Sequence, residues 1–84
     1  MKTEEDDALC KAFGLHLAKV RKSREYSQDR LAHEAGFGRS YVGDVERGLR
    51  NISLVNLFKI ADTLQIDVGN LLNFERPLNT KNLN

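Results

Sequence analysis

Three arginines lie close together in the middle of this 84-residue chain, at positions 39, 47 and 50. A guanidinium group keeps its charge at any working pH and presents a planar fork of N–H donors, so it suits phosphate oxygens. The formal net charge is only +1, partly because the first seven residues hold four of the twelve acids. This uneven distribution favours a local basic face that can bind phosphates, not a chain that binds polyanions over its whole surface.

Residues that could carry catalysis or hold a metal are few. Cys10 is the only cysteine, so no internal disulfide can form, as is typical of a reducing cytoplasmic setting. His16 and His33 lack the spacing of metal ligands and have no cysteine pair near them in the sequence. The acids come without a nucleophile or an obvious pocket. We therefore expect no enzymatic activity, no metal, no cofactor and no small-molecule ligand.

The elements that must position the arginines are short helices. Leu9, Phe13, Leu17 and Val20 recur at three- and four-residue steps and predict an apolar stripe on a first helix. Gly14 interrupts that helix, at a cost of about 1 kcal/mol relative to alanine.

Capping signals predict four more helices. Ser27, Ser53 and Asp67 are suitable N-caps, and Gly36 and Gly48 stand where helices should end. The third helix is expected at about 39–47. No stretch alternates with a period of two, so the predicted fold class is all-α, a compact five-helix bundle.

We expect one domain over residues 1–76, followed by a flexible polar tail at 77–84. No apolar run approaches the roughly 20 residues needed to cross a bilayer, and the acidic start does not resemble a signal peptide. The sequence therefore predicts a cytoplasmic protein without a membrane partner.

The segment 28–47 has the spacing of a helix-turn-helix. Ala32 is small enough for two helices to meet closely there, and Gly36 tolerates the positive φ of a sharp turn. This arrangement leaves the second helix of the pair exposed, with its N-terminal end free to enter a major groove. The inward positions that would lock the pair together are Leu31, Ala35, Phe37, Val42 and Val45.

The same segment resembles the Cro/repressor-type helix-turn-helix, or XRE, family, and the resemblance extends over about 17–72. It depends on the joint order of short pieces: Ser27-Gln28, Leu31-Ala32, Tyr41-Val42, Glu46-Arg47-Gly48, Arg50-Asn51, Ile60 to Leu64, Ile66 and Leu71-Leu72. It implies a lambda-repressor-like DNA-binding domain in a transcriptional regulator. In size the chain is similar to the controller proteins of restriction-modification systems.

The resemblance also implies base-reading residues. Arg39 and Ser40 stand at the expected start of the third helix, where the family places base-reading side chains, and arginine can bond guanine in a bidentate way. Asp44 lies one turn further on, and could either accept from a cytosine amino group or hold an arginine in position. Gly43 departs from the larger polar residue often found there, so one family contact is expected to be missing.

Further roles follow from the same resemblance. Gln28, at the start of the second helix, is expected to bind phosphate. Arg21 resembles the family arginine that pairs with the acid equivalent to Glu46, which implies a structural salt bridge. The other candidate contacts to the DNA backbone are Tyr41, Arg47, Arg50 and Asn51.

A symmetric homodimer is expected, because one protomer reads only a few base pairs. Two recognition helices would then lie about 34 Å apart on a palindromic operator. We expect the protein to regulate its own gene and to be associated with the nucleoid. By the same resemblance, an apolar cluster near the C-terminus and its polar rim are assigned to the isologous interface, although the cluster could also be ordinary core. These residues are Ile66, Val68, Asn70, Leu71, Leu72, Asn73 and Phe74.

Two alternatives remain open from the sequence. An antitoxin would use the same DNA-binding core and would need a toxin-binding segment. A protein-interaction adaptor could use the fold without DNA, since fold does not fix function. Activation of transcription would further require a surface that contacts RNA polymerase, and no residue identifies one.

Overall fold

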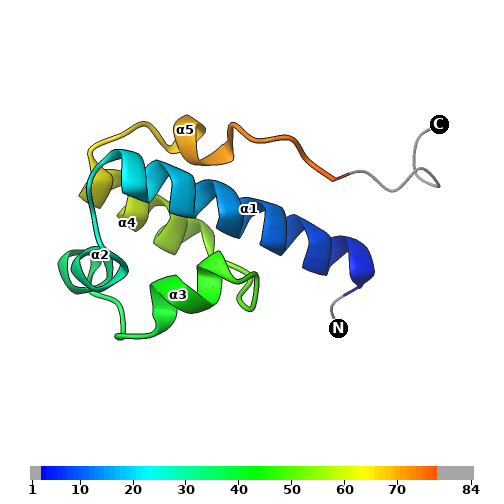
Figure 1. Ribbon diagram of the computed structural model, residues 1–84, viewed down its shortest axis with the longest axis horizontal. Helices are drawn as coiled ribbons and strands as arrows, with labels where there is room; N and C mark the ends of the chain where they lie inside the picture. Colours follow the sequence, from blue (N-terminus) through cyan, green and yellow to red (C-terminus); the bar gives the residue numbers. More distant parts are fainter. Residues whose placement is uncertain (1–2, 78–84) are drawn as a thin grey trace.

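The computed structural model describes residues 3–77, and this range contains five helices and no strand (Figure 1). The helices are α1 Glu4–Ser23, α2 Gln28–Ala35, α3 Tyr41–Glu46, α4 Leu54–Leu64 and α5 Val68–Leu72. The predicted all-α class is confirmed. Within residues 3–77 no helix combines the length and apolarity that a membrane span requires. The predicted tail, apart from Pro77, lies outside the described residues.

Local capping chemistry sets most helix boundaries. The Ser27 hydroxyl accepts from the Arg30 N–H at 3.0 Å, and the Ser53 hydroxyl accepts from the Asn56 N–H at 3.1 Å, which satisfies donors that a helix start leaves unpaired. Gly36 ends α2 with a φ of 80°. The expected third helix was too long at its start, because α3 begins at Tyr41 and Arg39 lies in the preceding turn.

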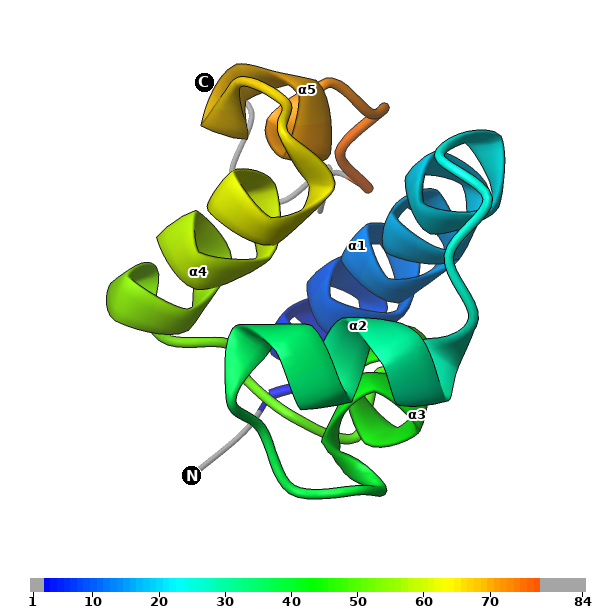
Figure 2. The same ribbon diagram turned by 90° about the vertical axis from the view of Figure 1, so that its left-hand side faces the viewer.

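All five helices contribute to one core. α1 packs against α3 and α5, and α4 packs against α2 and α5 (Figures 1 and 2). Burying these apolar side chains provides the main driving force for a domain of this size. The largest fully buried side chains are Leu17, Leu31, Val42, Val45, Ile60, Leu64 and Leu71.

Gly14 does not interrupt α1, which is continuous from Glu4 to Ser23. Instead, the backbone at the end of α3 lies directly against it. A Cβ atom at Gly14 would meet the carbonyl oxygens of Glu46 and Val45, the latter at 2.5 Å. Since backbone atoms cannot move aside as a flexible side chain does, the close approach of α1 and α3 requires glycine here.

Gly14→Ala is therefore expected to destabilise the protein by about 1–3 kcal/mol, in spite of alanine's higher helix propensity. Chemical denaturation measures the change in the free energy of unfolding. Gly69→Ala is the matched control, because Gly69 is also helical and a Cβ atom there would meet no other part of the described chain within 4 Å. Equal stability of the two variants would contradict the close approach.

Candidate nucleic-acid interface

α2, the following turn and α3 form the predicted helix-turn-helix. Gly36 supplies the left-handed conformation in the turn, and the Phe37 N–H donates to the Ala32 carbonyl at 2.8 Å. Val42 and Val45 anchor α3 in the core. Figure 2 shows α2 and α3 together at one edge of the molecule, below α1 and α4. Because its apolar side faces inward, α3 leaves its polar side to solvent.

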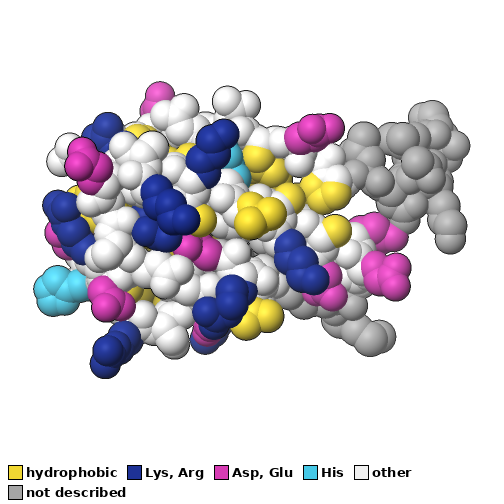
Figure 3. Space-filling model, in the orientation of Figure 1, with side chains coloured by type: hydrophobic (Ala, Val, Ile, Leu, Met, Phe, Trp, Pro, Cys, Tyr) yellow, Lys and Arg dark blue, Asp and Glu magenta, His cyan; other side chains and the backbone are white. Residues whose placement is uncertain are grey.

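Charge on this region is mixed. Figure 3 shows Lys and Arg side chains projecting at the edge where α2 and α3 lie, with Asp and Glu among them. A mixed surface of this kind binds phosphate at particular points, whereas a uniform basic surface binds any polyanion. The position of each arginine relative to the acids therefore matters more than the net charge.

Arg39 and Ser40 are exposed in the turn directly before α3. Within residues 3–77 the Arg39 side chain forms none of the recorded hydrogen bonds or ion pairs, and it borders a shallow hollow with Asp29, His33 and Phe37. A guanidinium group in this state has its donors available for a ligand. Arg39 is thus the arginine in this region whose side chain the structure leaves uncommitted.

Gly43 is buried beneath two long polar side chains. A Cβ atom at Gly43 would lie 3.4 Å from Arg47 Nη1 and 3.4 Å from Gln28 Oε1. The space that a larger residue at this position would fill is therefore occupied by side chains from α2 and from the end of α3. Gly43 therefore leaves room for Gln28 and Arg47 to lie against α3.

Asp44 pairs with two of the arginines. Arg47 Nη2 donates to Asp44 Oδ1 at 2.5 Å, and Arg50 Nη2 lies 3.6 Å from Asp44 Oδ2. The side chain of Asp44 is 20% exposed, compared with 62% for Arg47 and 53% for Arg50. In this structure Asp44 holds arginines in position, which is one of the two roles considered from the sequence, because each of its carboxylate oxygens faces an arginine.

Arg21 and Glu46 form a buried ion pair. Arg21 Nε and Nη2 donate to the two Glu46 oxygens at 2.6 and 3.0 Å, and Arg21 Nη1 donates to the Tyr26 carbonyl at 2.7 Å. Both side chains are less than one-tenth exposed. Gln28 Nε2 also donates to Glu46 Oε1 at 2.8 Å. Glu46 therefore connects α1, the start of α2 and α3.

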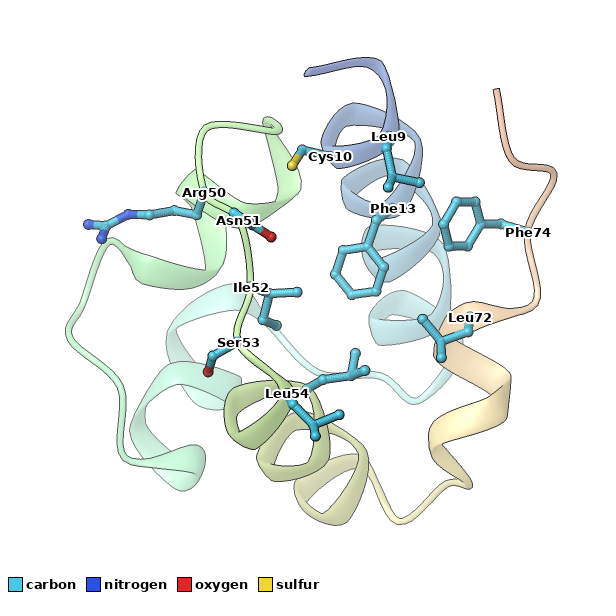
Figure 4. Close-up of a pocket in the computed structure, with 11 residues that line it drawn as sticks. Leu9, Cys10, Phe13, Arg50, Asn51, Ile52, Ser53, Leu54, Leu72 and Phe74 are labelled. Atoms are coloured by element: carbon cyan, nitrogen blue, oxygen red, sulfur yellow. The ribbon is translucent and has the colours of Figure 1, made fainter. Parts of the chain in front are cut away.

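Tyr41 connects the turn with α4. Its ring centroid lies 4.6 Å from that of Phe37, and Asn56 Nδ2 donates to its hydroxyl at 2.9 Å. The Arg50 guanidinium lies 5.5 Å from the Tyr41 centroid. Tyr41, Arg47 and Arg50 are thus brought together, whereas Asn51 is exposed at the mouth of an apolar groove (Figure 4).

A further charged cluster on α2 was not expected from the sequence. Arg30 Nε donates to Glu34 Oε2 at 2.9 Å, and its guanidinium carbon lies 3.9 Å from the Tyr26 centroid. The hydrogen bond from Arg30, with a second from Tyr26, lowers the pKa of Glu34. The hydrogen bond to Glu34, with partial burial, raises the pKa of Tyr26. Arg30 is thus held in an intramolecular pair. An arginine and an acid at i and i+4 on α2 could have revealed it.

The late apolar cluster divides into buried and exposed members. Leu71 has no exposed surface and belongs to the core of its own chain, so assigning it to a dimer interface was wrong. Leu72 is 52% exposed. Ile66, Val68 and Phe74 are half-buried against the core, while Asn70 and Asn73 are exposed.

A further apolar surface, on α4, was not predicted from the sequence. Leu54, Val55 and Phe58 are 70%, 64% and 46% exposed. Leu54 and Leu72 border the same groove of about 310 Å³, together with Leu9, Phe13, Leu57 and Phe74 (Figure 4). We call Leu54, Val55, Phe58 and Leu72 the apolar face. Apolar residues on more than one side of α4 were the available signal for it.

Comparison with known proteins places this geometry among DNA-binding regulators. The helix-turn-helix family HTH_3 matches residues 17–71. The control protein C.BamHI of Bacillus amyloliquefaciens is 41% identical over 63 residues, which is 74% of this chain and 78% of that protein.

Solved structures agree with this relationship. The restriction-modification controller protein C.AhdI from Aeromonas hydrophila has a TM-score of 0.75 and 46% identity, over 77% of this chain and 94% of that one. The biofilm regulator SinR, solved in complex with DNA, has a TM-score of 0.67 and 35% identity, over 73% of this chain and 98% of that one.

Proposed function

Because this chain belongs to the HTH_3 family, of the XRE type, and is a sequence-specific DNA-binding transcriptional regulator, we propose that it acts as a homodimer on a palindromic operator. We further propose that the operator lies upstream of its own gene and that the protein controls a restriction-modification system. The observation that carries the proposal is the exposed Arg39 directly before α3, whose side chain makes no hydrogen bond or ion pair within residues 3–77. An enzymatic step has no part in this function.

The proposed contacts follow from the geometry of α2 and α3. Arg39 lies in the turn directly before α3, at the end of the helix that would enter a major groove, where it can donate two hydrogen bonds to one guanine. Ser40 and Asp44 are the other proposed base contacts. Gln28, held by Glu46, presents the start of α2 to phosphate. The remaining proposed backbone contacts are Tyr41, Arg47, Arg50 and Asn51.

The apolar face is the proposed centre of the dimer interface. Exposed leucine, valine and phenylalanine side chains on neighbouring α4 and α5 would lose contact with water against a second copy. Residues at the edge of this face would then form the rim. These are Ile66, Val68, Asn70, Asn73 and Phe74. The two copies of α3 in such a dimer would have to lie about 34 Å apart to enter successive major grooves.

The controller role is supported by the identity of the relatives. Both C.BamHI and C.AhdI are named as control proteins, and each is more than 40% identical to this chain over about three-quarters of its length. Restriction and methylation genes beside the gene for this chain would agree with the proposal. A small toxin gene there would instead favour the antitoxin.

Arg39→Ala tests the proposed function. Wild type is expected to bind the DNA upstream of its own gene with two protomers per site, and Arg39→Ala to bind it about 10- to 100-fold more weakly. The loss should be much smaller on random duplex, since a base contact carries sequence discrimination. Fluorescence anisotropy titration at two salt concentrations measures both affinities.

Lys19→Ala is the matched control, because it removes one positive charge from the exposed side of α1. If both variants lose operator affinity equally, Arg39 does not read a base. If wild type prefers the upstream DNA no more than random duplex, autoregulation is wrong. If it also binds no member of a randomised duplex pool at low salt, operator binding is wrong as well.

A further inference from the structure

An acid stands among the arginines that would meet the DNA backbone. Asp44 lies on α3 itself, and its two oxygens face Arg47 at 2.5 Å and Arg50 at 3.6 Å. All three side chains remain in contact with solvent, Asp44 least. An incoming phosphate oxygen and the Asp44 carboxylate would therefore compete for the same guanidinium donors.

Gly43 leaves room for Arg47 to lie beside this carboxylate. Since no side chain occupies position 43, Arg47 lies back across α3 with its Nη1 at 3.4 Å from where a Cβ would be. Asp44, three residues before Arg47, holds the Arg47 side chain there as an i, i+3 ion pair. Arg50 reaches the same carboxylate from the loop after α3. Two arginines from different elements thus converge on one acid.

We propose that Asp44 sets the specificity of this regulator by occupying Arg47 and Arg50 until the correct base pairs release them. The inference rests on the proposed DNA-binding function. Phosphate contacts supply nearly all affinity for non-specific DNA, so an acid that competes for two phosphate-binding arginines weakens binding to every sequence. Only a site that offers Asp44 another donor can restore those contacts.

The chemistry of that donor is defined by the carboxylate. An ionised carboxylate only accepts hydrogen bonds, and the exocyclic amino groups of cytosine and adenine are the major-groove donors. At such a base Asp44 exchanges its arginines for the amino group, and Arg47 and Arg50 turn to the phosphates. At other sequences Arg47 and Arg50 stay paired with Asp44 and make no contact with the phosphates.

Asp44→Asn tests this role, because asparagine keeps the shape of the side chain and removes the charge that holds Arg47 and Arg50. We expect affinity for random duplex to rise about three- to ten-fold at moderate salt, while affinity for the operator does not rise. The plot of log association constant against log salt for random duplex should steepen by about 1–2 per protomer, as expected for one or two additional phosphate contacts. A purely structural role would not change this slope.

Asp62→Asn is the matched control, since it removes the same charge from an exposed position near the C-terminal end of α4. Thermal denaturation of each variant checks that the fold is intact. Equal changes in both variants, an unchanged random-duplex affinity for Asp44→Asn, or an equal rise on operator and random DNA would each overturn the inference. Failure of wild type to bind any duplex would instead overturn the proposed function, and this inference with it.

Discussion

Glu46→Ala is expected to lower the free energy of unfolding by about 3–5 kcal/mol, the usual effect of removing one partner from a buried ion pair. The Arg21 guanidinium would remain less than one-tenth exposed, with only the Tyr26 carbonyl as acceptor. Gln28 would lose the acceptor of its side-chain amide as well. Urea denaturation followed by circular dichroism measures the loss.

The exposed pair of Arg30 and Glu34 provides the control. Its side chains are 52% and 39% exposed, so water can replace either partner, and Glu34→Ala should change stability far less. The double variant Arg21→Met with Glu46→Leu should be more stable than Glu46→Ala alone, because no buried charge is then left unpaired. A Glu46→Ala protein as stable as Glu34→Ala would show that the ion pair does not hold the helices together.

Leu54→Glu is expected to convert the proposed dimer to monomer and to weaken operator binding by about 100-fold or more. A charge in the middle of the apolar face cannot be buried against a second copy, and loss of the dimer removes the gain from engaging two half-sites together. The single chain should tolerate the change, since Leu54 is 70% exposed and an acid suits the first turn of α4. Sedimentation equilibrium without DNA and anisotropy titration with operator measure the two effects.

Leu15→Glu controls for the added charge and the lost apolar surface, because Leu15 is 73% exposed on α1, outside the apolar face. It should leave both self-association and operator affinity close to wild type. If Leu54→Glu still sediments as wild type does, α4 does not lie in the interface, and a dimer would have to form elsewhere.

The helix-turn-helix was predictable because its signals are local. Ser27 and Gly36 act through bonds within a few residues, so the bounds of α2 could be deduced from residue type alone. The start of α3 could not. Its N-cap is Ser40, whose side chain makes no capping bond, and a periodic pattern does not show whether a preceding turn is helical.

Positions that depend on packing between helices were harder to assign. Leu71 and Leu72 are adjacent and chemically equal, yet one is fully buried and the other half exposed, because α5 has only one side against the core. The same reason explains why the exposure of Leu54 on α4 was missed. Gly14 looked like a weak point of α1, since the backbone that it contacts belongs to a helix about thirty residues later.

The contacts among Arg21, Glu46 and Gln28 also separate two kinds of mutation in this protein: those that disturb the support of α3 and those that change the side chains offered to DNA. The polar contacts that join α3 to α1 and α2 centre on its last residue, Glu46, whereas residues 39–44 include the exposed side chains offered to a ligand. Exchanging residues 39, 40 and 44 together would therefore alter the recognised sequence while the contacts among Arg21, Glu46 and Gln28 stay intact. A domain divided in this way can acquire a new operator by a few codon changes. Related regulators within one cell can then stop binding one another's operators.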